Sequence, residues 1–380
     1  MKILLIGEYY SENLGDPLLC QTVEKIIKDV YPQTEIVPFD MSGKTGFSSF
    51  YSLGHYDLGT KLFLKITQMF PKMLSNSSFM RSYRADEHRY LRVWCALNDL
   101  LKTHSFDLAV FAGGSLFMDY FAGIIYMIVK RLSISGTRII FHACGMSRLD
   151  ADAEYLLKRA LRENNIVSIS LRDSYARFCE LFSTSAEVID TYDTALGCSK
   201  YFLPSSVRST DYGIGLMAHE GFYEQQKNLI KQLLASGVSW KVFTNGARYD
   251  MFYAKKILSE CGIEEKDMCN YLVARPKSSK ELVCTVTQFE KIISFRMHSQ
   301  IVAASFGIPC FAFAWDNKVV DLFEKLGLQQ NYSCEEVDLE KIQQVISFDA
   351  SRMKTTALTQ AEISRQCLIK TISVALSCDQ

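Results

Sequence analysis

Several motifs that would identify a metal site or a cofactor at once are absent from this sequence. There is no C-x-x-C pair, and the six histidines are scattered without any H-x-x-x-H, so we expect no metal site. Neither G-x-G-x-x-G nor the full Walker motif occurs, so nothing predicts a nicotinamide or nucleotide cofactor. Excess charge of one sign is also absent, because 42 basic residues balance 42 acidic ones. We therefore expect no attraction to nucleic acid, and any anionic ligand must be bound locally.

Long apolar runs are missing as well. The most apolar segment, residues 121–129, is about nine residues long and ends at Lys130, whereas a bilayer span needs roughly 20. The short apolar run after Lys2 stops at Glu8, which predicts a first strand rather than a secretory leader. Twelve cysteines are present, and those in apolar segments are expected to be buried, free thiols (Cys144, Cys179, Cys310). These features favour a reducing cytoplasm over a disulfide-forming compartment.

What is present is an alternation of strand-like apolar runs with helical patterns, which predicts parallel α/β architecture. A chain of 380 residues fits two domains, and the polar segment 203–211 separates two strand–helix series. We place the domains at 1–204 and 205–380, each a Rossmann-like doubly wound sheet, facing a cleft at the carboxyl ends of their strands. Strands are expected at 2–7, 34–39, 107–113, 138–143, 166–171 and 186–190, then at 212–217, 240–246, 270–275, 291–295 and 310–315.

Two segments depart from this alternation. Residues 41–98, rich in Ser, Gly, Tyr and Phe, are predicted to form an irregular insert with helical patterns such as 60–70, and we assign them no chemistry. Residues 353–378 predict one or two helices that pack back onto the first domain.

The corner Arg296-Met297-His298 is the most informative part of the chain. It lies between a predicted strand and a predicted helix, and alternation along an extended backbone would put Arg296 and His298 on the same side. The helix that begins there directs free N–H groups and the positive end of its dipole to the same place. This combination predicts an anion site with a proton donor.

Other corners follow strand ends in the first series. Gly15 and Asp16 end a polar loop, where Asp16 either caps a helix with Pro17 at its first position or helps to bind a ligand. Gly113 and Gly114 allow a close backbone approach, and Ser115 after them either caps the next helix or donates a hydrogen bond to a ligand.

Further polar residues at strand ends have both a functional and a structural interpretation. Arg172 reaches toward the cleft or pairs on the surface with Asp173, and either Asp173 or Ser174 caps the next helix. Asp193 is a ligand contact or a turn-forming residue. The remaining candidates are Ser299 beside the Arg296 corner, His142 as a core histidine and His219 as a loop residue.

Taken in order, several segments resemble the polysaccharide pyruvyl transferase family. They are NLGD (13–16), FAGGSLFMD (111–119), SLRDSYA (170–176), DTYDTAL (190–196) and, most specifically, FRMHSQIVAASFGIPCFAF (295–313), with Ala112 standing where the family has the first of three glycines. The resemblance implies a fold similar to B-type glycosyltransferases and transfer of a pyruvyl group from phosphoenolpyruvate to sugar hydroxyls as a ketal. It implies that Arg296, His298 and Arg172 hold or activate the donor.

The residues agree with such a donor. Guanidinium groups match the carboxylate and phosphate of phosphoenolpyruvate, and a histidine suits proton transfer near neutral pH. The expected acceptor is a sugar of a cell-surface polysaccharide, or its lipid-linked precursor, which would bring the enzyme into peripheral contact with a membrane. Two alternatives stay open: a nucleotide-sugar glycosyltransferase and a non-catalytic glycan-binding subunit.

Overall fold

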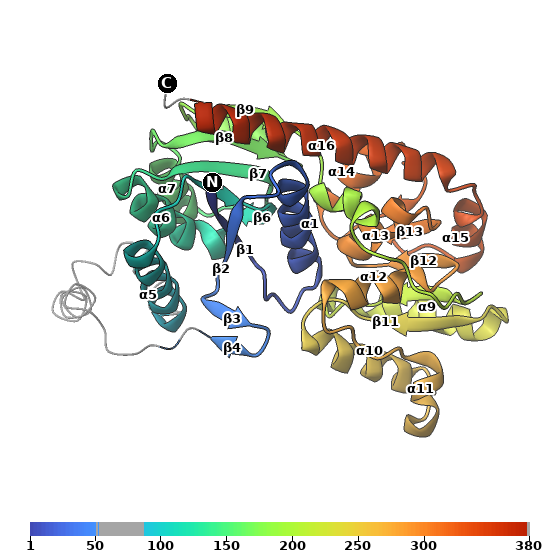
Figure 1. Cartoon of the computed structure of the whole chain (residues 1–380). Coiled ribbons are helices and arrows are strands. Elements are labelled where there is room, and N and C mark those ends of the chain that lie inside the picture. The colour runs from blue at the N-terminus through green and yellow to red at the C-terminus, as the bar shows by residue number, and fades with distance from the viewer. Residues whose placement is uncertain (51, 53–86, 378–380) are drawn as a thin grey trace. The chain divides into compact units, whose positions relative to one another are not determined.

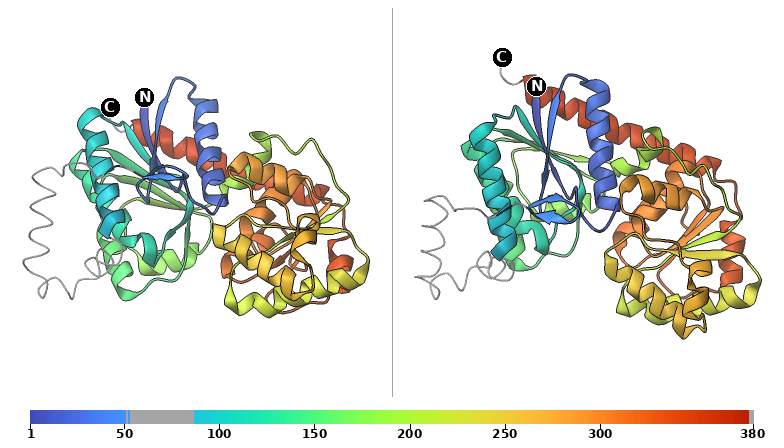
Figure 2. Two further views of the ribbon diagram at one scale, coloured as in Figure 1. Left: turned by 90° about the horizontal axis from the view of Figure 1, so that it is seen from below. Right: turned by 60° about the horizontal axis from the view of Figure 1, so that its bottom comes forward.

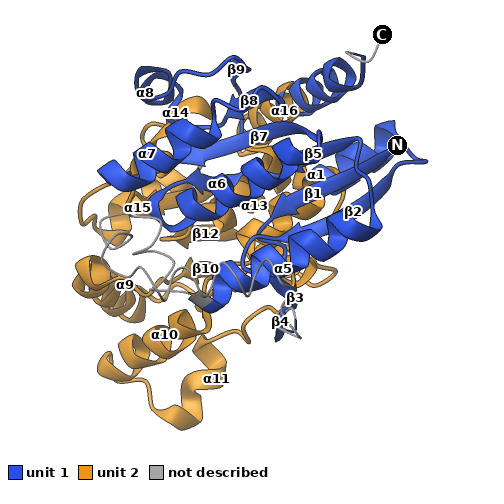
Figure 3. Cartoon of the chain, turned by 90° about the vertical axis from the view of Figure 1, so that its left-hand side faces the viewer, with its two compact units in different colours: residues 1–10, 23–192, 364–380 blue, residues 11–22, 193–363 orange. Residues whose placement is uncertain are grey.

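The computed structural model describes residues 1–50, 52 and 87–377 (Figure 1). The chain divides into two compact units, each with its own parallel sheet (Figure 3). Unit 1 comprises Met1–Tyr10, Val23–Tyr192 and Ser364–Gln380, and unit 2 comprises Ser11–Thr22 and Asp193–Ile363. The division at 192/193 lies before the predicted boundary at 204/205. The segment Ser11–Thr22, early in the chain, belongs to the second unit, which decides where Gly15 and Asp16 lie.

The sheet of unit 1 has the strand order β2-β1-β5-β7-β8-β9, with β6 paired to β7, and all of these strands are parallel. Its central strands are continuous apolar runs because helices cover both faces. Stacked rings of Phe111 and Phe141, with centroids 4.3 Å apart, join β5 to β7 in the core. The strands are β1 (Lys2–Gly7), β2 (Glu35–Asp40), β5 (Leu108–Phe111), β6 (Gly114–Phe117), β7 (Arg138–Met146), β8 (Ile166–Leu171) and β9 (Glu187–Asp190).

Helices cover both faces of the unit 1 sheet (Figure 2), and the strand order determines which face each helix covers. The order reverses at β1, so right-handed crossovers put the helix after β1 on one face and the helices between β2 and β8 on the other. The second group packs over an apolar core. The helices are α1 (Gly15–Val30), of which only the part from Val23 onward belongs to unit 1, α5 (Glu87–Thr103), α6 (Asp119–Ile134), α7 (Ala151–Ala160) and α8 (Tyr175–Leu181). A small hairpin of β3 (Lys44–Gly46) and β4 (Ser49–Phe50) precedes α5.

Unit 2 has a five-stranded parallel sheet of order β11-β10-β12-β13-β14. The rings of Phe295 and Phe313 stack with centroids 4.3 Å apart, within a core that α9, α10 and α15 complete. Its strands are β10 (Tyr212–Gly215), β11 (Trp240–Phe243), β12 (Lys291–Ser294), β13 (Cys310–Phe313) and β14 (Tyr332–Ser333). Its helices are η1 (Thr194–Lys200), η2 (Glu220–Phe222), α9 (Tyr223–Ser236), α10 (Arg248–Glu260), η3 (Glu265–Asp267), α11 (Met268–Tyr271), α12 (Ser279–Thr287), α13 (Met297–Phe306), α14 (Asn317–Lys325) and α15 (Leu339–Ile346).

The predicted α/β class with two Rossmann-like sheets is confirmed. The strand expected at 270–275 is wrong: this run ends α11 and touches β11 through one isolated bridge, Val242 to Leu272. The expected insert 41–98 is helical from Glu87 onward, while the pattern at 60–70 lies outside the described residues. The last segment is one helix, α16 (Ser351–Ser377), and its residues from Ser364 onward belong to unit 1, where Lys370 Nζ lies 3.5 Å from Glu187 Oε1.

The cysteines of the described segments are free thiols. Cys144 and Cys310 are buried as predicted, but Cys179 is exposed because it lies on the outer side of the short helix α8. No helix in the described part of the chain is both long and apolar enough to span a bilayer.

Candidate functional site

The Arg296 corner lies at the carboxyl end of β12 in unit 2. Arg296 is the N-cap residue of α13 and has an extended backbone (φ −116°, ψ 121°), but the helix already begins at Met297. The predicted alternation through His298 is therefore wrong, because His298 is a helical residue in the first turn. Burial leaves the imidazole only 6% exposed. The corner still joins a guanidinium, an imidazole and a helix N-terminus.

Two serines hold this corner in shape. The Ser294 hydroxyl accepts from the Arg296 backbone N–H at 3.0 Å and lies 2.7 Å from the Ser299 hydroxyl. Ser299 Oγ in turn donates to the Arg296 carbonyl at 2.6 Å. Ser299 is fully buried, so these contacts give it a structural role at the start of α13.

Asp250 on α10 is the partner of Arg296, and the sequence did not point to it. Arg296 Nε donates to Asp250 Oδ2 at 3.0 Å, and Nη2 donates to Oδ1 at 2.7 Å. The carboxylate is buried and also accepts from the Ala218 backbone N–H at 3.0 Å. A fork of this kind is strong and directional, so the plane of the guanidinium is set by a residue from another helix. In the sequence, residues 249–262 show a helical pattern that contains aromatic side chains. The signal that could have indicated Asp250 is that it is a polar residue on the buried side of this helix.

Gly15 is the first residue of α1 and packs directly on His298. A Cβ at position 15 would lie 2.0 Å from His298 Nδ1, so only glycine fits against the imidazole. Asp16 is inside the first helical turn, and the predictions of an Asp16 N-cap and of Pro17 as the first helical residue are therefore wrong. Its carboxylate accepts from Ser11 Oγ at 3.0 Å. The structure thus brings Gly15, His298 and Arg296 together within unit 2.

The loop before Gly15 is attached to unit 2 by contacts that the sequence analysis missed. Arg275 Nη2 donates to the carbonyls of Glu12 and Gly246, at 2.7 and 2.8 Å. The Leu14 N–H donates to the Asn245 carbonyl at 2.9 Å, and Arg248 Nε lies 3.2 Å from Glu12 Oε1. Burial lowers the pKa of Arg275 from its usual value, and the Glu12 carboxylate acts in the opposite direction. These bonds fix the loop that presents Gly15.

Unit 1 has a second arginine corner at the carboxyl end of β8. Arg172 Nε lies 3.3 Å from Asp173 Oδ2, and Nη2 donates to Ser115 Oγ at 3.3 Å. Asp173 Oδ1 accepts from the Met146 N–H at 2.8 Å. The predicted pairing of Arg172 with Asp173 is confirmed, but Arg172 is only 6% exposed, so the pair is buried and does not lie on the surface. The Arg172 side chain is also held against the glycine loop that follows β5.

The glycine loop has the backbone that glycine permits. Gly113 and Gly114 have φ values of 75° and 85°, in the left-handed region that other residues rarely adopt. Ala112 precedes them with its N–H bonded to the Ile6 carbonyl at 2.8 Å. Ser115 lies on β6 and does not cap α6, whose N-cap residue is Met118.

Backbone strain flanks the Arg172 corner. Ala143 and Ser174 have φ values of 50° and 56°, which are costly for residues with a Cβ. Ser174 is the N-cap residue of α8, yet neither its side chain nor that of Asp173 caps the helix. Ser170 Oγ accepts from the Ala143 N–H at 2.8 Å and lies 3.2 Å from His142 Nδ1, so His142 is the core histidine that was predicted.

The other candidates have structural surroundings. Asp193 caps η1 in unit 2 by accepting from the Ala195 N–H at 2.8 Å. This contact corresponds to the predicted alternative of a turn-forming residue. The His219 carbonyl accepts from the Tyr253 hydroxyl at 2.7 Å. Burial raises the pKa of the Cys144 thiol, and Arg172 acts in the opposite direction. No group of three or more His, Cys, Asp or Glu side chains suited to a metal ion occurs in the described part of the chain.

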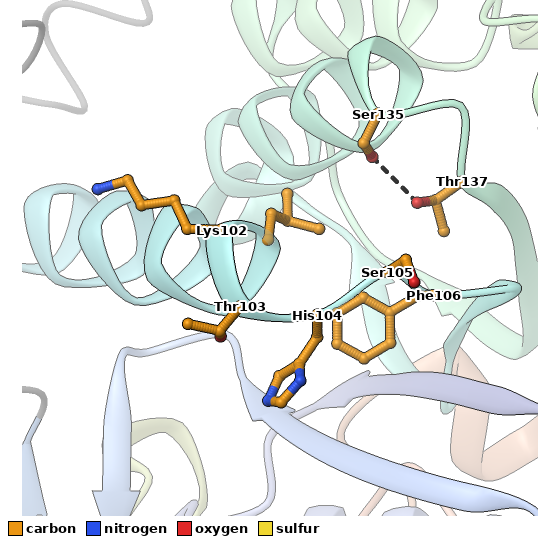
Figure 4. A pocket seen from close by; sticks show the side chains of 8 residues that line it. Lys102, Thr103, His104, Ser105, Phe106, Ser135 and Thr137 are labelled. Carbon is orange, nitrogen blue, oxygen red and sulfur yellow. Dashed lines mark hydrogen bonds between the residues drawn. The ribbon is translucent and has the colours of Figure 1, made fainter.

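A pocket of about 380 Å³ lies elsewhere in unit 1, beside residues that precede β5 and β7 (Figure 4). It is therefore at the amino edge of the sheet, whereas Gly113 and Arg172 follow strand carboxyl ends. The Ser135 and Thr137 hydroxyls in its wall are bonded to each other at 3.0 Å, and His104 Nδ1 is bonded to Lys2 Nζ at 2.9 Å. Parallel α/β sheets bind ligands at the carboxyl edge, so this pocket is not the candidate site.

Comparison with known proteins identifies the family of the chain. The sequence model of the polysaccharide pyruvyl transferase family matches residues 13–317, which include every candidate residue, and the chain belongs to that family. No curated protein matches the sequence.

Solved structures are similar in fold. UDP-GlcNAc 2-epimerase from Methanocaldococcus jannaschii aligns over 98% of this chain and 99% of its own, with TM-score 0.59 and 8% identity. The enzyme from Neisseria meningitidis aligns over 98% and 100%, with TM-score 0.56 and 11% identity. The spinosyn rhamnosyltransferase SpnG aligns over 98% and 100%, with TM-score 0.53 and 9% identity. At these identities the likeness concerns the fold alone, which is that of B-type glycosyltransferases and related epimerases.

Proposed function

We propose that this member of the family transfers the pyruvyl group of phosphoenolpyruvate to two hydroxyls of one sugar and forms a ketal. The observation that carries the proposal is the unit 2 corner, where Arg296 and His298 meet at a helix N-terminus with Gly15 packed on the imidazole. The sugar belongs to a cell-surface polysaccharide or its lipid-linked precursor. Free thiols throughout the described segments support action in the cytoplasm.

The chemistry requires three changes at the donor. A proton is added to the methylene carbon, sugar oxygens attack the central carbon, and the carbon–oxygen bond to phosphate breaks. Of the two hydroxyl protons, one ends on the new methyl group and the other leaves with phosphate, so no oxidant or reductant is needed. An imidazole near neutral pH suits this proton transfer, which we assign to His298.

The two arginines have the electrostatic role in this proposal. The phosphate gains negative charge as its bond to carbon breaks, and oriented guanidinium groups stabilise such charge more in the transition state than in the bound donor. Arg296 is 19% exposed at its side chain and Arg172 is held beside the glycine loop, so each has a defined direction. That both act on one donor stays a prediction.

Phosphate release from phosphoenolpyruvate, measured with candidate glycans, tests the function. We expect His298→Ala to lower kcat by about 100-fold or more, the usual size for a positioned acid or base. His219→Ala is the matched control, because His219 lies in a loop of the same unit, and it should retain full activity. Arg172→Ala and Arg296→Ala should each lower turnover, and because each leaves a buried aspartate unpaired, each should also lower the melting temperature.

Thermal shift separates the alternatives. Stabilisation by UDP or GDP with none by phosphoenolpyruvate would replace the proposal by a nucleotide-sugar glycosyltransferase. Binding of glycans without turnover of either donor would indicate a non-catalytic subunit.

A further inference from the structure

The Arg296–Asp250 pair is unusual for an anion site. Asp250 is 1% exposed, and its carboxylate lies against the guanidinium that is expected to attract an anionic donor. A buried carboxylate weakens that attraction, so its presence needs a reason other than the strength of donor binding.

Geometry supplies the reason. Nε and Nη2 both bond to the carboxylate, and a guanidinium is planar, so these two bonds fix the direction of Nη1 as well. The carboxylate cannot turn easily, because Oδ1 also accepts from the Ala218 N–H at 3.0 Å. Asp250 therefore holds the Arg296 guanidinium in one orientation by its Nε and Nη2 edge.

The chain makes room for this pair at Gly246. A Cβ at position 246 would lie 2.1 Å from Asp250 Oδ2 and 2.3 Å from Arg296 Nη2. The Gly246 carbonyl also accepts from Arg275, at 2.8 Å from Nη2, and Arg275 holds the loop that carries Gly15 to His298. The same backbone turn therefore supports both the arginine and the contact to the histidine.

We propose that Asp250 is a positioning residue of the donor site, which holds the Arg296 guanidinium so that its Nη1 edge faces the anionic donor. This inference rests on the proposed function. Asp250 itself touches no reacting atom, and its effect passes entirely through Arg296.

A double-mutant cycle tests that dependence. Asp250→Asn keeps the shape but removes the charge and one acceptor, and we expect it to lower kcat/KM for phosphoenolpyruvate roughly 10- to 100-fold, the effect of a misplaced catalytic group. In an Arg296→Ala background the same change should cause no further loss, because the group it orients is gone. Losses that multiply in the double variant would overturn the proposal. Asp267→Asn, on η3 of the same unit, is the control and should be unchanged.

A second variant covers failure of Asp250→Asn to fold. Gly246→Ala leaves both side chains intact and displaces them, so it should lower kcat/KM. Most of this loss should disappear in the Arg296→Ala background, and any remainder would come from the loop that the same turn supports through Arg275. Normal kinetics with Gly246→Ala would count against the proposal.

Arginine NMR separates this inference from the proposed function. The Nε–H signal of Arg296, identified by its loss in Arg296→Ala, should exchange slowly in the wild-type protein and rapidly in Asp250→Asn. Equal exchange rates would overturn the positioning role whatever the donor is. Absence of phosphoenolpyruvate turnover in the wild-type protein would overturn the function, and the exchange rates would still decide the role of Asp250.

Discussion

Each unit contains an arginine at the carboxyl end of a strand, paired with an aspartate and backed by a glycine, but the pairs are built differently. In unit 1, Arg172 pairs with its neighbour Asp173, and both side chains are almost completely buried. In unit 2, Arg296 pairs with Asp250, 46 residues away on another helix, and its side chain is 19% exposed. The second arrangement orients the guanidinium and leaves one edge accessible.

The difference shows two ways of aiming a charged group. A neighbour in sequence places its carboxylate wherever the local backbone puts it, and in unit 1 that backbone is strained at Ser174, the residue after Asp173. A partner from another helix needs no local strain, but it depends on the packing of α10 against the sheet. We expect the unit 2 pair to be more sensitive to small changes in packing.

The glycines behind the two pairs give the largest expected effect. Gly246→Ala would put a Cβ 2.1 Å from Asp250 Oδ2, whereas Gly145→Ala would put one 2.5 Å from Asp173 Oδ2. We expect both variants to lose activity, Gly246→Ala by about 100-fold and Gly145→Ala by less, since displacement of a catalytic group by about 1 Å has an effect of this size. Steady-state kinetics with phosphoenolpyruvate checks the order. The reverse order would show that the strained corner of unit 1 is the more sensitive one.

Gly15 extends the comparison from the arginines to the histidine. Gly15→Ala would put a Cβ 2.0 Å from His298 Nδ1, so either α1 or the imidazole must move. We expect kcat to fall by roughly 10-fold and stability to fall by about 1–3 kcal/mol, the usual cost of overpacking. Gly221→Ala is the matched control, because its Cβ would meet only the His219 ring, at 3.2 Å. Denaturant unfolding of both variants measures this difference. An unchanged free energy of unfolding for Gly15→Ala would contradict close packing on His298.

Ionisation of buried thiols in unit 2 is expected to have a smaller effect, which concerns the pH dependence of stability. Burial raises the pKa of Cys198 and of Cys310 to about 12 from the usual 9.0. Because the folded pKa is raised, this contribution to stability is present below pH 9 and is lost as the pH rises from 9 toward 12. At pH 10 the loss is about 1 kcal/mol per thiol.

Melting temperatures of the wild-type protein and of Cys310→Ala between pH 8 and pH 10.5 measure this loss of stability. Cys310→Ala should be less stable than the wild-type protein at pH 8, because packing is lost. As the pH rises, the variant should lose less stability than the wild-type protein. Parallel slopes for the two proteins would show that Cys310 does not ionise on unfolding.

Much of the fold was predictable because each strand and helix has a local signature. The apolar runs at 2–7 and 138–143 became β1 and the start of β7, and the loop after β12 did carry Arg296 to a helix start. The short strand β14 and the helix α15 were missed, and the run at 270–275 was assigned to a strand although only one of its residues pairs with β11. A short segment at a sheet edge has too few residues for its periodicity to decide its structure.

By itself, the sequence determined the α/β class, the family and the residue types at the strand ends, because these depend on local patterns and ordered motifs. Only the tertiary structure decided that Gly15 belongs to unit 2 and packs on His298, and that Asp250 holds Arg296. The physical reason is that such contacts join segments far apart in the chain. Their distances follow from strand order and helix packing, and no local pattern of residues encodes them.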